Sequence, residues 1–248
     1  APHNSVRVAA AMELLQAFLL IHDDIMDRDT VRRGIPSVYH QYVLESDNWG
    51  LNEPAHAGEA LGICAGDIAF FTAFEMVGAA DLPGGVKSEI FRLSSRELSY
   101  VGIAQMVDVY YGADRKTPEP DEVLHLYTYK TGRYTFSLPL MIGGLAAEQS
   151  REGISVLEDI GVALGTIFQL KDDELGIFGD EEKLGKPFGS DIKEGKKTLF
   201  YIFLFEQAGS AERKKLSSIF GNQHASAGDV AYVRDLMSSC GLRKKVDE

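Results

Sequence analysis

Apolar residues recur at three- and four-residue steps along most of this 248-residue chain, and runs that alternate apolar and polar residues are scarce. Steps of three and four place residues on one face of an α-helix, whereas alternation is typical of a half-buried strand. The pattern therefore predicts an all-α protein. Because 45% of the residues are hydrophobic and no linker divides the chain, we expect a single domain over residues 1–248.

Charge and cysteine content exclude several classes of protein. A net charge of -12 argues against a broad surface for nucleic acid or anionic membrane. Cys64 and Cys240 are too few for a disulfide framework, which fits a reducing compartment. The apolar stretch "AFLLI" is much shorter than the roughly 20 residues of a spanning helix. We expect a soluble, cytoplasmic protein with no transmembrane segment and no nucleic-acid partner.

Local signals predict where the helices begin and end. The first apolar helix ends in the acidic tip "HDDIMD", where "RRGIPS" breaks it. A second helix, rich in small residues that permit close packing, is expected over about 55–79. Thr117 and Pro118 predict the N-cap and first residue of a later helix, which Pro139 should kink. A helix over about 151–178 and two short helices beyond Gly209 should follow.

Three aspartates lie within five positions at the end of the first apolar helix. This first aspartate group consists of Asp23, Asp24 and Asp27. Asp23 and Asp27 share a helix face, and like charges at this spacing destabilise a helix. A cation should therefore compensate them. The candidates are a metal ion, the pair Arg32 and Arg33, or water alone.

A second aspartate group closes another apolar helix. It consists of Asp172 and Asp173, with Asp180 following after Gly176. If the two helices face one another, their carboxylates converge on one cavity mouth. Donor sets made only of oxygen select hard cations, and Mg²⁺ is usually held by a few carboxylates together with waters and phosphate oxygens. Basic residues that suit a diphosphate are Arg32, Arg33, Lys130, Lys186, Lys196 and Lys197.

Simpler interpretations exist for each of these features. An isolated DDxxD on a helix is most often a solvated acidic face, and the lysines near 196 could be ordinary surface charge. His22, beside the first aspartate group, is expected to be packed or hydrogen-bonded, because Mg²⁺ favours oxygen ligands. Because a second apolar helix also ends in aspartates, a metal site is favoured over a solvated acidic face.

Several motifs resemble those of the trans-prenyltransferase (polyprenyl diphosphate synthase) family. "HDDIMDRDTVRRG" resembles its first aspartate-rich motif, and "FQLKDDELGIFGDEEKLGKPFGSDIKEGKKT" resembles the second motif with its lysine loop. "GEALGICAGDIAFF", "GIAQMVDV" and "YKTGRYTF" match in family order, so the resemblance covers nearly the whole chain. The chain is most similar to the geranylgeranyl diphosphate synthases. The resemblance implies the isoprenoid synthase helical bundle around a deep central cavity, in a homodimer.

The resemblance also implies roles for individual residues. The ligands of Mg²⁺ would be Asp23, Asp24, Asp27, Asp172 and Asp173. The substrate-binding residues would be Arg32, Arg33, Gln105, Asp108, Lys130, Lys186 and Lys196. The catalytic residues would be Asp23, Asp24, Lys130, Thr131 and Gln169. Among these, Arg33 would favour isopentenyl diphosphate, and Thr131 and Gln169 would present oxygen dipoles to an allylic cation.

The implied reaction is a head-to-tail condensation of isopentenyl diphosphate with an allylic prenyl diphosphate. Mg²⁺ and basic side chains would stabilise the departing diphosphate as the allylic carbon ionises, and the implied product is geranylgeranyl diphosphate. Phe18 matches the family position that limits chain length, with ordinary core packing as its alternative. Helix geometry instead favours Leu19, which lies about 40° around the helix from Asp23, whereas Phe18 lies about 140° away.

Two departures from the family pattern leave alternatives open. Gly176 stands where many members have aspartate, so the second group would use two carboxylates and water or recruit Asp180. The family's upstream Gly-Lys-Arg segment is absent, so N-terminal helices and a C-terminal segment are expected to lie outside these 248 residues. The alternative functions are a farnesyl or longer-chain synthase, a terpene cyclase, a non-catalytic regulatory subunit of a heteromeric synthase, and a cation-binding helical module. The arginine pair and the retained aspartates favour catalytic chain elongation.

Overall fold

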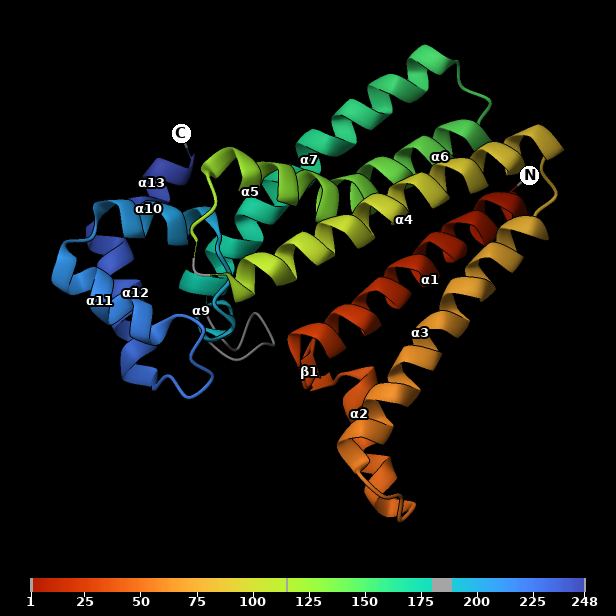
Figure 1. Ribbon diagram of the computed structural model, residues 1–248. Coiled ribbons are helices and arrows are strands. Elements are labelled where there is room, and N and C mark those ends of the chain that lie inside the picture. The colour runs from red at the N-terminus through yellow and green to blue at the C-terminus, as the bar shows by residue number, and fades with distance from the viewer. Residues whose placement is uncertain (1, 115, 180–188, 248) are drawn as a thin grey trace. The chain divides into compact units, whose positions relative to one another are not determined.

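The computed structural model describes residues 2–114, 116–179 and 189–247, and this part of the chain is almost entirely helical (Figure 1). The α-helices are α1 (Pro2–Asp27), α2 (Val38–Asn48), α3 (Pro54–Gly78), α4 (Gly84–Ala113), α5 (Pro120–Tyr127), α6 (Leu138–Ala146), α7 (Arg151–Phe178), α9 (Ser190–Glu194), α10 (Leu199–Gln207), α11 (Ser210–Ile219), α12 (Ala227–Ser239) and α13 (Leu242–Asp247). A π-helix, η1 (Thr128–Ser137), joins α5 to α6. The strands β1 (Val31–Arg32) and β2 (Ile35–Pro36) form one antiparallel pair. The prediction of an all-α protein is confirmed.

The chain folds into two compact units. The first unit comprises Ala1–Ser95 and Pro139–Ser155, and the second comprises Arg96–Leu138 and Val156–Glu248. The expectation of a single domain stays a prediction.

Close helix packing organises the first unit. Helix α1 lies along α3, and α2 also packs against α3 (Figure 1). A Cβ atom at Gly58 would lie 2.3 Å from Val43 Cγ2, and one at Gly66 would lie 2.4 Å from His22 Nε2. Gly62, between them on the same face, is similarly crowded. The small residues of α3 therefore permit the close packing that the sequence predicts.

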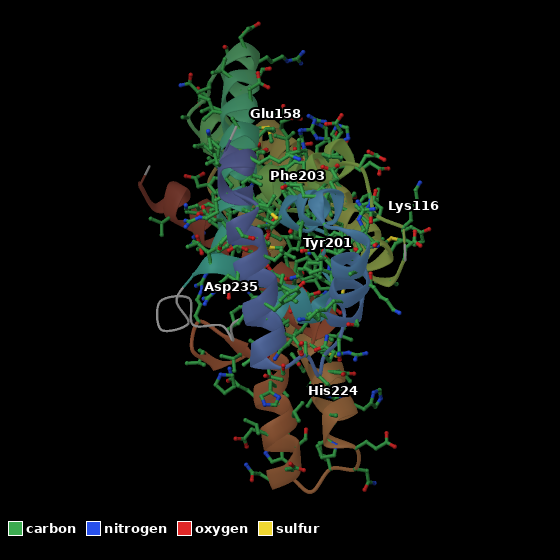
Figure 2. All side chains as sticks on the ribbon, turned by 90° about the vertical axis from the view of Figure 1, so that its left-hand side faces the viewer. Lys116, Glu158, Tyr201, Phe203, His224 and Asp235 are labelled. Atoms are coloured by element: carbon green, nitrogen blue, oxygen red, sulfur yellow. The ribbon has the colours of Figure 1, made fainter. Side chains whose placement is uncertain are left out.

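An apolar core holds the second unit together. Buried side chains of α10 pack with those of α11, α12 and α13 and with the end of α7. The ring centroid of Tyr201, labelled with Phe203 in Figure 2, lies 4.3 Å from that of Phe205, with the two ring planes tilted by 30°. Full burial of a large apolar side chain contributes about 1.5–3 kcal/mol. Thr198 begins α10 by accepting a hydrogen bond from the Tyr201 backbone N–H at 3.3 Å.

One helix boundary and one number of helices differ from the prediction. Helix α5 begins at Pro120 rather than Pro118, with Glu119 as its N-cap. The Glu122 side chain accepts a hydrogen bond from the Glu119 N–H at 2.8 Å, and a proline in the first helical position loses no helical hydrogen bond. From Ser210 to Asp247, the end of the described residues, the chain forms three helices, α11, α12 and α13, instead of two.

A π-helix precedes Pro139, where the sequence predicts a kink. The Leu138 N–H donates to the carbonyl of Arg133, five residues earlier. Pro139 has no N–H to donate and its ring crowds the carbonyl four residues before it, so a wider turn relieves the conflict.

Helices α3 and α7 are long and apolar enough to cross a membrane, judged by length and composition alone. Core helices of soluble proteins pass the same test. The expectation that no segment spans a membrane therefore stays a prediction.

Candidate active site

The first aspartate group lies at the end of α1, in the first unit. Arg32 Nε donates to Asp24 Oδ1 at 2.6 Å, and Arg32 Nη2 lies 3.7 Å from Asp23 Oδ2. Asp24 is only 2% exposed. Burial raises the pKa of the Asp24 carboxyl, and the hydrogen bond from Arg32 acts in the opposite direction. Arg32 is therefore a cation that compensates this group.

A short hairpin brings Arg32 to the end of α1. Arg32 pairs with Ile35 across the strands, and Arg33 and Gly34 form the turn with φ angles of 54° and 78°. Two successive positive φ angles are typical of a two-residue hairpin turn whose twist matches that of its strands. The turn directs Arg32 towards Asp24 and leaves Arg33 exposed at the tip.

Phe18 packs between α1 and α3. Its ring centroid lies 4.8 Å from that of His22 and 4.9 Å from that of Phe70. His22 Nε2 lies 3.1 Å from the Ile63 carbonyl oxygen, so the expectation of a hydrogen-bonded histidine is confirmed. Phe18 and Leu19 are both half-buried, and their roles in chain length stay predictions.

In the second unit, η1 and α4 bring Lys130 and Asp108 together. Lys130 Nζ donates to the carboxylate of Asp108. Gln105 lies one turn earlier on α4, and its Nε2 is buried without a hydrogen-bond partner among the residues that the structure describes. An unsatisfied buried N–H is costly. This position therefore suits an acceptor oxygen of a bound molecule.

A chain of hydrogen bonds links η1, α7 and α5. Thr131 Oγ1 donates to Gln169 Oε1 at 2.7 Å, and Gln169 Nε2 donates to Asp173 Oδ1 at 2.9 Å. Tyr127 donates its hydroxyl proton to the other oxygen of Asp173 and accepts from the Leu199 N–H at 3.3 Å. Because Gln169 Nε2 donates to Asp173, Gln169 Oε1 is the atom that faces Thr131. The Thr131 hydroxyl proton is therefore directed towards Gln169.

The two adjacent aspartates of the second group differ in environment. Asp173 is 5% exposed, whereas Asp172 is exposed. Burial and the nearby Asp191 carboxylate raise the pKa of Asp173 to about 7, against the opposing hydrogen bonds from Tyr127 and Gln169. The pair therefore offers one buried, oriented carboxylate and one exposed carboxylate.

Asp191 lies against Gly176, the glycine at the fifth position of the second motif. A Cβ atom at residue 176 would lie 2.6 Å from Asp191 Oδ2. The Asp191 carboxylate therefore occupies the space that a side chain at this position would need. Asp180, the alternative from the sequence, lies outside the described residues.

The basic residues near α9 have different partners. Lys196 Nζ lies 2.9 Å from Glu194 Oε2 and 3.9 Å from Asp191 Oδ1. Lys197 Nζ donates to the backbone carbonyls of Asp114 and Lys116, and burial lowers its pKa. Lys197 therefore ties the start of α10 to the chain after α4. Lys186 lies outside the described residues.

Oxygen donors dominate both aspartate groups. Within residues 2–114, 116–179 and 189–247, no three His, Cys, Asp or Glu side chains gather as a metal site. Mg²⁺ commonly takes only one or two protein carboxylates and completes its shell with water and substrate phosphate oxygens. The donor chemistry fits Mg²⁺ held with a substrate, and the convergence of the two groups, which lie in different units, stays a prediction.

A family model described as "Polyprenyl synthetase" matches residues 1–237. The chain belongs to the polyprenyl synthetase family. The resemblance of its motifs to this family is thereby confirmed, and the individual residue roles stay predictions.

Relatives within the polyprenyl synthetase family include two archaeal proteins. The chain is 36% identical to a geranylgeranyl diphosphate synthase of Sulfolobus acidocaldarius, over 95% of this chain and 65% of that protein. It is 33% identical to a geranylgeranyl diphosphate synthase of Saccharolobus solfataricus, over 98% of this chain and 69% of that protein. The chain thus spans about two thirds of the length of these relatives.

A solved structure supports the fold. The geranylgeranyl pyrophosphate synthase from Corynebacterium glutamicum, complexed with isoprenyl diphosphate and magnesium, matches with a TM-score of 0.91 at 30% identity. The match covers 98% of this chain and 69% of that protein. The isoprenoid synthase fold is therefore confirmed.

Several contacts in this member of the polyprenyl synthetase family were not predicted from the sequence. Tyr127 lies outside the quoted motifs, four residues before Thr131, and Asp191 lies within the second motif but was not singled out there. The buried pair of Glu97 with Arg133 was also missed, because its members lie on separate helices. The contacts of Lys130 with Asp108 and of Thr131 with Gln169 do join residues named from the sequence.

Proposed function

We propose that the chain carries the active site of a short-chain trans-prenyl diphosphate synthase, which condenses isopentenyl diphosphate with an allylic prenyl diphosphate. The observation that carries the proposal is the geometry of η1. It presents Lys130 and Thr131 at successive positions, and each side chain is bound to a polar group of a different helix, Asp108 of α4 and Gln169 of α7. This arrangement places a cation for a diphosphate beside an oriented oxygen dipole.

Each of these side chains has a definite task in the proposed reaction. Because Thr131 donates its proton to Gln169, the lone pairs of its oxygen remain to stabilise a developing allylic cation. Lys130 and Arg32 supply positive charge for the diphosphate, and the Gln105 side-chain N–H, which has no acceptor within the described part of the chain, is placed to donate to an oxygen. The released diphosphate removes the proton after condensation, so the reaction requires no protein base.

The five predicted aspartate ligands suit Mg²⁺. A carboxylate has about four acceptor positions, so Asp24 and Asp173 can bind a cation while Arg32, Tyr127 and Gln169 orient them. When bound with substrate, Mg²⁺ supplies positive charge that stabilises the departing diphosphate.

Product length and assembly are also part of the proposal. Geranylgeranyl diphosphate is the proposed product, because both archaeal relatives carry that name and because Phe18 matches the family's chain-length position. A cytoplasmic homodimer without membrane segments is proposed from the resemblance. Ile68 and Phe71 on α3, 67% and 69% exposed, are the kind of apolar surface that such an interface covers.

The test is to incubate the purified full-length protein with isopentenyl diphosphate, Mg²⁺ and each allylic primer in turn, and to identify the products by mass. We expect geranylgeranyl diphosphate, and no product after Mg²⁺ is chelated. Farnesyl diphosphate or longer chains would overturn the product assignment alone. Failure of the protein to form product with any primer would overturn the assignment as a synthase and favour a regulatory subunit.

A further inference from the structure

Glu97 is a buried carboxylate that the proposed reaction does not use. It lies on α4 and is 0% exposed. Arg133 of η1 binds both of its oxygens, with Nε 2.6 Å from Oε2 and Nη2 2.9 Å from Oε1. Arg96 Nε also donates to Glu97 Oε1, at 2.7 Å. A charge buried this completely is tolerated only when it is paired and hydrogen-bonded, and Glu97 meets that condition through Arg133 and Arg96.

Further groups hold the Arg133 guanidinium in one position. Glu158 of α7, labelled in Figure 2, accepts a hydrogen bond from Nη2. The rings of Tyr100 and Tyr129 lie 5.7 and 5.8 Å from Arg133 Cζ, within the range of cation–π attraction. Arg133 therefore joins η1 to α4 and α7 through contacts on several sides.

The segment that Arg133 holds is the one that presents Lys130 and Thr131. A Cβ atom at Gly165 of α7 would lie 2.1 Å from Gly132 Cα, so η1 lies directly against α7. Ser137 Oγ, at the end of η1, donates to the Glu158 carbonyl oxygen at 2.9 Å. A π-helix of ten residues is unusual, because such turns mostly occur singly inside α-helices. Tertiary contacts are therefore needed to maintain it.

We propose that Glu97 is a positioning residue, which acts through Arg133 to hold η1 in its π-helical register and thereby aims Lys130 and Thr131. Glu97 itself does not touch the substrate. A change from π-helical to α-helical bonding shifts each backbone pairing by one residue, and so rotates Lys130 and Thr131 away from Asp108 and Gln169. The inference rests on the proposed function, because the task of Lys130 and Thr131 belongs to that reaction.

The test compares two variants of the full-length protein. Glu97→Gln keeps the side-chain shape and one acceptor but removes the charge that binds Arg133. Arg96→Ala is the matched control, because it removes another partner of the same carboxylate and leaves the Arg133 pair intact. We expect Glu97→Gln to lower kcat about 10- to 100-fold, the scale of a small misplacement of catalytic groups. The KM for isopentenyl diphosphate should stay within about twofold of wild type, since Lys130 and Thr131 act on the allylic partner.

Two further measurements separate positioning from general stability. Amide hydrogen exchange over residues 129–137 should become faster in Glu97→Gln and stay slow in Arg96→Ala. In an Arg133→Gln background, Glu97→Gln should lower kcat no further, because both substitutions break the same link. If Glu97→Gln fails to fold, Arg133→Lys takes its place, since lysine keeps the charge but loses the two-pronged contact.

Several results would overturn the inference. These are a wild-type kcat in Glu97→Gln, a loss of kcat in Arg96→Ala equal to that in Glu97→Gln, or losses of kcat that multiply when Glu97→Gln and Arg133→Gln are combined. A lower melting temperature with unchanged kcat and unchanged exchange in η1 would make Glu97 merely structural. If the wild-type protein makes no product with any primer, the proposed function fails. Hydrogen exchange alone then tests whether Glu97 holds η1 through Arg133. Loss of protection in η1 only in Glu97→Gln would then support the link to Arg133, and equal exchange in both variants would overturn it.

Discussion

Asp24 and Asp173, one from each aspartate group, are buried carboxylates held by donors from other elements. Arg32 of the hairpin binds Asp24, and Tyr127 of α5 and Gln169 of α7 bind Asp173. A carboxylate oriented in this way needs little rearrangement to bind a cation, and removal of its neighbours commonly weakens metal binding. At the scale of single residues, the structure therefore orients two of the predicted ligands before any cation binds.

Asp24→Ala should lower turnover at least about 100-fold, because the change removes a carboxylate of the first aspartate group and the partner that orients Arg32. Steady-state rates at ordinary Mg²⁺ concentrations measure the effect, and circular dichroism should show an intact helical fold. Asp47→Ala, at an exposed position of α2, is the control and should be active. A normal rate in Asp24→Ala would contradict the metal assignment.

Phe18→Ala should lengthen the product chain if Phe18 limits the space for the growing tail. Its ring now packs against His22 and Phe70, so truncation opens space between α1 and α3. Mass analysis of the products from Phe18→Ala and Leu19→Ala compares the family pattern with the helix-geometry alternative. Longer products only from Leu19→Ala would favour the geometric candidate, and an unchanged profile in Phe18→Ala would return Phe18 to the core.

At the scale of elements, the contact between η1 and α7 depends on two glycines. In Gly165→Ala the new Cβ would lie 2.1 Å from Gly132 Cα, a backbone atom that cannot move without shifting the helix. We expect a loss of about 1–3 kcal/mol in the free energy of unfolding, measured by denaturant titration. In Gly102→Ala the new Cβ would meet no described atom of another segment within 4 Å, so the free energy of unfolding should instead rise by up to about 1 kcal/mol. Equal effects of the two changes would argue against this packing.

The contact of α9 with α7 makes a second prediction at this scale. Gly176→Ala places a Cβ atom 2.6 Å from Asp191 Oδ2 and should displace that carboxylate. If the Asp191 carboxylate adds to the negative charge that attracts Mg²⁺ to the second aspartate group, its displacement should raise the Mg²⁺ concentration at half-maximal rate about 10-fold or more. Asp191→Asn should have the same effect, whereas Gly153→Ala, which only touches neighbouring side chains, should have little. An unchanged Mg²⁺ requirement in both Gly176→Ala and Asp191→Asn would exclude this role.

At the scale of the whole molecule, helix positions followed from the sequence because their causes are local. Apolar periodicity and glycine or proline signals placed the helices that became α1, α3 and α7. The hairpin was missed because it requires a positive φ at Arg33, which few residues other than glycine adopt. The π-helix was missed because its support comes from Glu97, 36 positions before Arg133.

The candidate site was predictable to a similar degree. Motif resemblance named Lys130, Thr131 and Gln169, and the structure joins the last two through a hydrogen bond. Tyr127 and Asp191 were not predicted, because a buried hydroxyl or a carboxylate beside a glycine becomes visible only when separate helices are packed. The motifs thus name the proposed reacting groups, and the structure shows which side chains form hydrogen bonds with them.

The central claim is that both aspartate groups act on one diphosphate. Its most direct test is the rate at which labelled isopentenyl diphosphate is converted to geranylgeranyl diphosphate by Asp23→Ala, Asp172→Ala and the double variant. We predict that each single change removes most of the activity and that the double change removes little more, because both groups serve the same ionisation. Losses that multiply as for independent sites, or full activity in either single variant, would contradict the account.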